Sequence, residues 1–166
     1  MRTLYLLRHA KSSWEDPALP DRDRPLAPRG RRDAERLGKY LRGLKITPVL
    51  VLCSSSARTQ ETLELLGPGL AGAAISVEEQ LYGASSEVLL ERVRAVPGEV
   101  ASVLLIGHNP GMHDLARMLA SSGADLDRLE AKFPTAALAT LALPRWHTLR
   151  ARDAELVAYV VPKQLH

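Results

Sequence analysis

Short apolar runs alternate along this chain with segments in which apolar residues recur at helical spacing. The runs are of strand length, and the one at 48–54 is apolar almost throughout, without alternating polar residues. Continuous runs of this kind are typical of strands that are covered on both faces. We therefore predict strands at 3–7, 48–54, 73–79, 101–107, 136–143 and 154–161.

The segments between these runs predict amphipathic helices. Residues 28–44 place Ala34, Leu37 and Leu41 on one face and charged residues on the other. Strands that alternate with helices predict one α/β domain over residues 1–166. We expect a three-layer α/β/α sandwich with a mostly parallel central sheet and an antiparallel pair among its last strands. The other helices are expected at 57–66, 85–96 and 111–121.

Cationic side chains stand where the predicted strands stop. Arg8 and His9 follow the first strand, Arg58 follows the second after three serines, and His108 follows the strand at 101–107. In an open α/β sheet, ligands bind at the carboxyl ends of the strands. We therefore expect these four side chains, which are far apart in the sequence, to converge on one rim of the sheet.

Two arginines and two histidines suit phosphoryl transfer. Guanidinium groups bind phosphate oxygens in bidentate fashion, and a neutral imidazole can act as a nucleophile. A second histidine, when protonated, would add a hydrogen-bonding cation. This set is coherent without a metal or a cofactor. A metal site on His108 and His113 is not expected, because Pro110 interrupts the helical spacing between them.

The motifs at the strand ends resemble the histidine phosphatase superfamily, in its phosphoglycerate mutase-like branch. LLRHAKSSW resembles the Arg-His-Gly signature of that family, with Ala10 in place of glycine, and SSSARTQET resembles its second-arginine motif. GHNPG resembles its second-histidine motif in the form found in SixA-type phosphohistidine phosphatases, and RPLAPRGRRDAERLG resembles the helix after the first motif. The resemblance extends over nearly the whole chain, in the expected order.

The resemblance implies a role for each matching residue. His9 would be the nucleophile that becomes phosphorylated. Arg8 and Arg58 would hold the phosphoryl oxygens, and His108 would be the second histidine of the phosphate pocket. EEQLYGA resembles the stretch that carries the general acid of the family, with Glu79 at the matching position. Weaker candidates for this acid are Glu78 and Asp16.

Further candidate ligands of the phosphate or the substrate are Lys11, Ser12 and Asn109. Lys11 stands where many phosphomonoesterases of the family carry glutamate, which puts their small-molecule specificity in doubt here. For Trp14, which also falls near this rim, we expect a packing role.

The segment between Tyr82 and Val103 has room for one short helix, where larger relatives place a lid-forming insertion. A site without a lid should be open, which favours a phosphorylated protein side chain, above all phosphohistidine. Two alternatives remain. The first is a phosphatase of a small phosphoester such as a sugar or nucleotide phosphate, and the second is a phosphate-binding module without turnover.

Composition narrows the setting of the protein. Net charge is +3 and aromatic residues make up 4% of the chain, which argues against a nucleic-acid partner. The single cysteine, Cys53, fits a reducing cytoplasm, and no apolar run is long enough to predict a membrane segment. The oligomeric state is not predicted.

Overall fold

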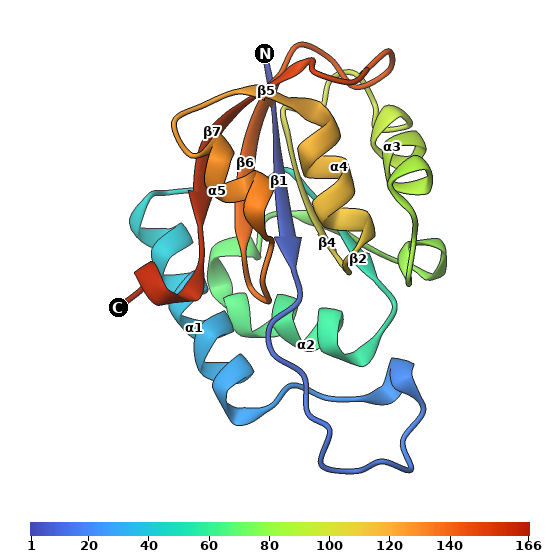
Figure 1. The fold of residues 1–166 in the computed structure, drawn as a ribbon, viewed down its shortest axis with the longest axis vertical. Coiled ribbons are helices and arrows are strands. Elements are labelled where there is room, and N and C mark those ends of the chain that lie inside the picture. The colour runs from blue at the N-terminus through green and yellow to red at the C-terminus, as the bar shows by residue number, and fades with distance from the viewer.

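The computed structural model describes residues 1–166 as a seven-stranded sheet between two layers of helices (Figure 1). The strands are β1 (Arg2–Arg8), β2 (Leu50–Ser54), β3 (Ala74–Glu78), β4 (Ser102–Gly107), β5 (Ala120–Ser122), β6 (Leu138–Leu143) and β7 (Ala154–Val160). The helices are α1 (Pro28–Gly43), α2 (Ala57–Leu66), α3 (Ser86–Arg94), α4 (Gly111–Leu119) and α5 (Leu126–Ala131). Short 3-10 turns lie at 21–23, 68–70, 79–81 and 162–164.

The sheet is mostly parallel, as the sequence predicts. Its strand order is β3-β2-β4-β1-β6-β7-β5. Strand β6 runs antiparallel to both of its neighbours, β1 and β7, and every other pair is parallel. Because β1, β2 and β4 lie side by side and point the same way, their carboxyl ends meet at one edge, and the predicted cationic residues follow these ends.

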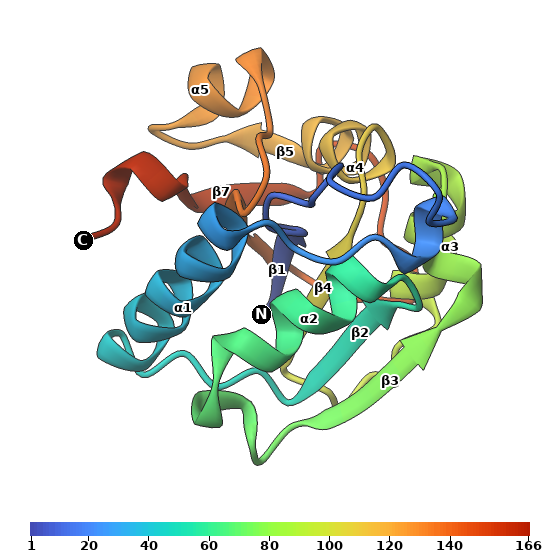
Figure 2. The ribbon, with the colours of Figure 1, turned by 90° about the horizontal axis from the view of Figure 1, so that it is seen from below.

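Each central strand buries side chains on both faces. Leu6 and Leu105 pack with α3, α4 and α5 in one core, whereas Leu7 and Leu104 pack with α1 and α2 in a second core. Figure 2 shows α1 and α2 on one side of the sheet and α3, α4 and α5 on the other. This two-sided burial accounts for the continuous apolar runs in the sequence and confirms the three-layer sandwich.

Two short elements were not predicted from the sequence. The chain forms β5 at Ala120–Ser122, so α4 ends before the expected boundary, and then α5 at Leu126–Ala131. Elements of three and six residues are too short to show a periodic pattern. Between Leu81 and Ser102 the only helix is α3, so no lid is inserted there. None of the helices has the length and apolar character needed to cross a lipid bilayer.

Candidate active site

The carboxyl ends of β1 and β4 and the first turn of α2 surround a cavity of about 250 Å³. We call Arg8, His9, Arg58 and His108 the floor of this cavity, and Lys11, Ser12, Trp14 and Arg24 its rim. Asn109 and Thr135 complete the wall. The structure therefore brings together seven of the eight predicted site residues, and Glu79 lies elsewhere. A larger, shallower depression of about 820 Å³ lies between α3 and the β6–β7 connection, away from these groups.

His9 is held so that one ring nitrogen faces the cavity as a nucleophile. Its Nδ1 lies 2.7 Å from the backbone oxygen of Ala10, which can only accept a hydrogen bond, so Nδ1 carries the proton. The neighbouring N–H of Ala10 donates to the Thr62 hydroxyl at 3.0 Å and fixes this peptide. Nε2 of the neutral ring is then left with its lone pair free.

Burial keeps this ring neutral. His9 is 7% exposed, and desolvation lowers its pKa to about 3. The hydrogen bond to Ala10 raises this pKa, whereas the charges of His108, Arg58 and Arg8 lower it further. At neutral pH the ring is therefore a neutral imidazole, with its proton on Nδ1, and its Nε2 is able to attack an electrophile.

His108 lies beside His9, with 5.4 Å between the ring centroids. Its Nε2 is 2.7 Å from the hydroxyl of Ser54, which is fully buried at the end of β2. Desolvation, with the nearby Arg58, lowers the pKa of His108 to about 4. The second histidine is thus neutral in this structure, not the cation considered from the sequence. When Ser54 donates to Nε2, the proton of the ring sits on Nδ1.

Three buried side-chain nitrogens of the floor have no hydrogen-bond partner within the chain, and that of His108 carries a proton when Ser54 donates to its other ring nitrogen. They are Nε of Arg8, Nε of Arg58 and Nδ1 of His108. Buried donors without acceptors are rare and costly in folded proteins. Since all three residues line one cavity, a tetrahedral oxyanion bound there would supply the acceptors, and guanidinium groups are suited to phosphate oxygens.

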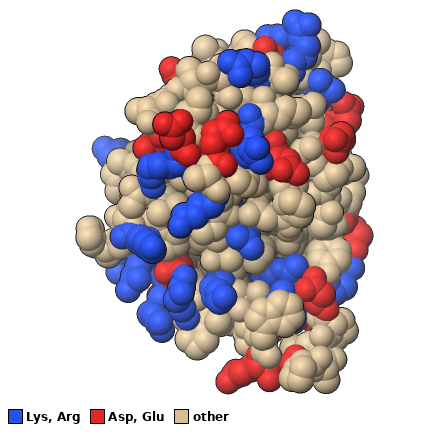
Figure 3. Space-filling view, in the orientation of Figure 1, with Lys and Arg blue, Asp and Glu red and all other residues tan.

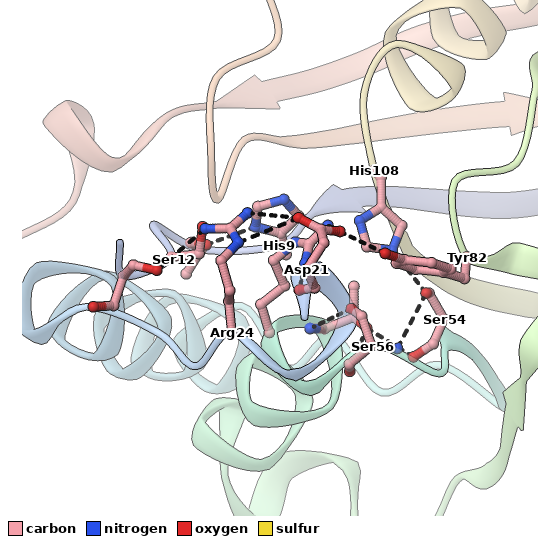
Figure 4. A network of polar contacts seen from close by, with 12 residues as sticks. His9, Ser12, Asp21, Arg24, Ser54, Ser56, Tyr82 and His108 are labelled. Carbon is pink, nitrogen blue, oxygen red and sulfur yellow. Dashed lines mark hydrogen bonds and ion pairs between the residues drawn. The ribbon is translucent and has the colours of Figure 1, made fainter. Parts of the chain in front are cut away.

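Asp21 joins the rim to the floor (Figure 4). Arg58 donates to the backbone oxygen of Asp21 at 2.8 Å and to its carboxylate at 3.0 Å, and the Tyr82 hydroxyl donates to the same carboxylate at 2.5 Å. These bonds, with that of Tyr82 first, lower the pKa of Asp21 to about 2. Arg24 also bonds Asp21, at 3.2 Å, and the Ser12 hydroxyl, at 2.8 Å.

The segment that follows α5 forms one side of the cavity. The backbone oxygen of Phe133 accepts from Nη1 of Arg8 at 3.2 Å and from the side-chain amide of Asn109 at 2.7 Å. Asn109 therefore orients the wall, and its side-chain amide bonds the backbone, not a second side chain. Thr135 from this segment and Arg24 from the rim were missed by sequence reasoning. An Arg-Pro pair in a loop and a threonine before β6 carry no local signal of chemistry.

Glu79 lies outside the cavity. Its carboxylate forms a two-point ion pair with Arg22, at 2.5 and 2.6 Å, and accepts from the Ser55 hydroxyl at 2.8 Å. The Arg22 bonds, with Ser55, lower the pKa of Glu79 to about 2. Glu78 is paired with Arg92, and Asp16 caps its own turn through the N–H of Ala18. A general-acid role of Glu79 stays a prediction that this arrangement does not favour.

The remaining candidates for reactive or metal-binding chemistry are accounted for locally. Cys53 is buried in β2, where desolvation raises its pKa to about 12, which leaves an unreactive thiol. His113 bonds the backbone oxygen of Leu129 at 2.6 Å. No group of three potential metal-ligating side chains occurs in the structure.

Comparison with known proteins agrees with this geometry. The sequence profile of the "Histidine phosphatase superfamily (branch 1)" matches residues 4–109. An uncharacterized protein of Mycobacterium leprae is 37% identical, over 95% of this chain and 100% of that protein. A Nakamurella multipartitia protein assigned as the phosphohistidine phosphatase SixA is 35% identical, with a TM-score of 0.85, over 97% of this chain and 96% of that one. The protein histidine phosphatase SixA in complex with tungstate is 25% identical, with a TM-score of 0.80, over 98% of both chains.

The fold and the cluster of two arginines and two histidines are those of a histidine-dependent phosphatase. The chain belongs to the histidine phosphatase superfamily, because the family profile covers more than half of it and the full-length relatives exceed 30% identity. Its enzymatic class is accordingly that of a hydrolase.

Proposed function

We propose that this phosphatase removes the phosphoryl group from a histidine side chain of a protein, with His9 as the nucleophile. The observation that carries the substrate proposal is the chemistry of the cavity wall. Every polar side chain in it is cationic or neutral at pH 7. The nearby Asp21, which bonds Arg58 and Arg24, has a pKa of about 2 and holds no proton to donate, and Glu79 is held outside the cavity by Arg22. An alcohol leaving group needs a proton donor, whereas an imidazole whose other nitrogen is protonated leaves as a neutral ring.

The first step would exchange one P–N bond for another. Nε2 of His9 attacks phosphorus and forms a new N–P bond, while the bond to the substrate imidazole breaks and its electron pair returns to that nitrogen. The three unpartnered donors of Arg8, Arg58 and His108 would stabilise the charge on the equatorial oxygens. Because the substrate and the enzyme intermediate contain the same kind of bond, this step is close to isoenergetic.

The second step would be hydrolysis of phosphorylated His9. A water attacks phosphorus, the bond to Nε2 breaks, its electron pair returns to the ring, and the proton released by the water passes to solvent. Nδ1 keeps its proton throughout, because the backbone oxygen of Ala10 holds it at 2.7 Å. His9 can therefore leave as a neutral imidazole without a dedicated acid.

A protein substrate also suits the surroundings of the cavity. No lid covers it, since α3 is the only helix between Leu81 and Ser102. Figure 3 shows lysine and arginine side chains gathered over α1 and toward the carboxyl end of β1, whereas acidic side chains gather near α5. Such a surface favours the approach of an anionic partner. We further propose a reducing, cytoplasmic setting, which the single free thiol of Cys53 fits.

A turnover assay in the presence of EDTA tests this function. Wild-type protein and the His9→Gln variant are given a phosphohistidine-bearing protein, p-nitrophenyl phosphate and a panel of sugar and nucleotide phosphates. We expect the highest kcat/KM for the phosphohistidine protein, its loss in His9→Gln, and an acid-labile phosphoenzyme in the wild type. His147→Gln, at an exposed histidine, is the matched control and should behave as wild type.

Other outcomes would redirect the proposal. Faster hydrolysis of one small ester would keep the His9 mechanism and move the substrate to metabolism. Phosphate binding without turnover of any substrate would leave a binding module.

A further inference from the structure

We propose that the indole of Trp14 is the stacking surface for the leaving imidazole of the substrate, and thus a specificity-determining residue. This inference rests on the proposed function and adds to it the group that recognises the ring. A packing role was expected for Trp14 near the rim, but its side chain is 70% exposed and lines the cavity. The other tryptophan, Trp146, is 1% exposed and donates its indole N–H to Val100.

The orientation of Trp14 is set by a cation that is itself fixed. The guanidinium carbon of Arg24 lies 3.6 Å from the centroid of the indole, a close cation–π stack. Arg24 is 7% exposed and is held by Ser12, Asp21 and the backbone oxygen of Ser13. One face of the indole therefore rests on a buried, fully tethered group. An aromatic surface ordered before binding costs little entropy when a ligand covers it.

The geometry of the reaction places the leaving group beside this surface. The attacking and leaving atoms lie roughly in line through phosphorus. His9 is 7% exposed and forms the floor of the cavity, so the leaving nitrogen must lie toward its mouth. Trp14 and Lys11 are the exposed side chains of the rim. A planar imidazole at the opening of the cavity therefore contacts the indole of Trp14, which is the exposed aromatic side chain of the rim.

The test compares donors that differ in the leaving ring. Free phosphohistidine carries an imidazole, whereas phosphoramidate carries the same P–N bond with ammonia as the leaving group. For Trp14→Ala we expect the ratio of kcat/KM for phosphohistidine over phosphoramidate to fall roughly three- to tenfold, the range of an aromatic pair. Trp14→Phe should restore most of the ratio. Leu19→Ala, which removes a partly exposed apolar side chain of the same loop, should leave the ratio as in the wild type.

A binding readout separates stacking from a structural role. In a His9→Gln background the phosphohistidine substrate stays intact, and its binding should quench tryptophan fluorescence. The Trp14→Phe substitution in that background should abolish the quenching, because Trp146 is buried. An unchanged ratio in Trp14→Ala, or equal losses on both donors, would overturn the stacking role. Failure of the proposed function looks different, since wild-type protein would then hydrolyse a small phosphoester faster than the phosphohistidine protein, or would hydrolyse neither.

Discussion

The floor and the rim of the cavity are built in opposite ways. The floor follows strand ends and the first turn of α2, and its two histidines are fixed by Ala10 and by Ser54. The rim comes from the one long connection between β1 and α1, which Asp21 and Arg22 tie to the body through ion pairs. The sheet thus fixes the groups that need defined geometry, while a loop presents the groups that meet the partner.

The strongest test of this contrast is Arg58→Lys in the floor. Lysine keeps the positive charge but loses the planar fork that bonds Asp21 and leaves Nε facing the cavity. We expect kcat/KM to fall about 10²- to 10³-fold, as for loss of a transition-state donor. The control is Arg31→Lys on α1, where the exposed Arg31 pairs with Glu61 of α2, and this variant should keep full activity. A loss below about fivefold for Arg58→Lys would mean that charge alone, not geometry, holds the phosphoryl group.

A second test uses the pH dependence of stability. Burial lowers the pKa values of His9 and His108 to about 3 and about 4, whereas in the unfolded chain both lie near 6.5. The unfolded chain then binds more protons in this range, so the free energy of unfolding is fully developed above pH 6.5 and falls as the pH drops toward 4. Each ring contributes up to about 1.4 kcal/mol per pH unit.

Urea unfolding at pH 7, 6 and 5 measures this slope, because the carboxylates remain largely ionised there. His108→Gln should lower the slope, and His147→Gln, at an exposed position, should not. A wild-type stability that is constant between pH 7 and 5 would show that the floor accommodates protonated histidine, and would weaken the contrast with the open rim.

Two adjacent serines provide a matched pair of variants, because one contacts the floor of the cavity and the other lies outside the cavity. Ser54 is fully buried and bonds His108, whereas Ser55 bonds Arg22 and Glu79 outside the cavity. Ser54→Ala should reduce kcat/KM about tenfold and destabilise the fold by about 1–3 kcal/mol, because the buried Nε2 of His108 loses its partner. Ser55→Ala should leave kcat/KM within about twofold of wild type. Equal effects of the two substitutions would show that Ser54 does not position His108.

The same division explains what the sequence could predict. Arg8, His9 and His108 follow apolar strands directly. The predicted strand ends, with the rule that ligands bind at the carboxyl ends of the strands in an open α/β sheet, were therefore enough to predict that these residues lie together. Arg24 and Thr135 lie in irregular segments whose course is set by long-range contacts, such as Arg24 with Asp21 and Phe133 with Arg8. The exposure of Trp14 was not predicted for the same reason, since an aromatic residue in a loop carries no periodicity that distinguishes a buried position from an exposed one.

The smallest effect is expected for Glu79→Gln. Glu79 is two-thirds exposed, is ion-paired with Arg22, and has a pKa of about 2, so at neutral pH it holds no proton to donate. Exposed pairs of this kind contribute little. We expect kcat/KM for the phosphohistidine protein to remain within about twofold of wild type. Arg22→Gln removes the other member of the same ion pair and serves as the matched control variant.

Small esters make this last test decisive. If Glu79 turned to the cavity with a ligand bound and protonated a leaving alcohol, its loss would matter most for poor leaving groups. Glu79→Gln is therefore assayed with p-nitrophenyl phosphate, which leaves readily, and with glycerol phosphate, which does not. Small and equal changes on both substrates would show that Glu79 is not the general acid, as its ion pair with Arg22 implies. A loss of about a hundredfold confined to glycerol phosphate would instead assign the acid to Glu79 and make the turn at 79–81 part of the catalytic machinery.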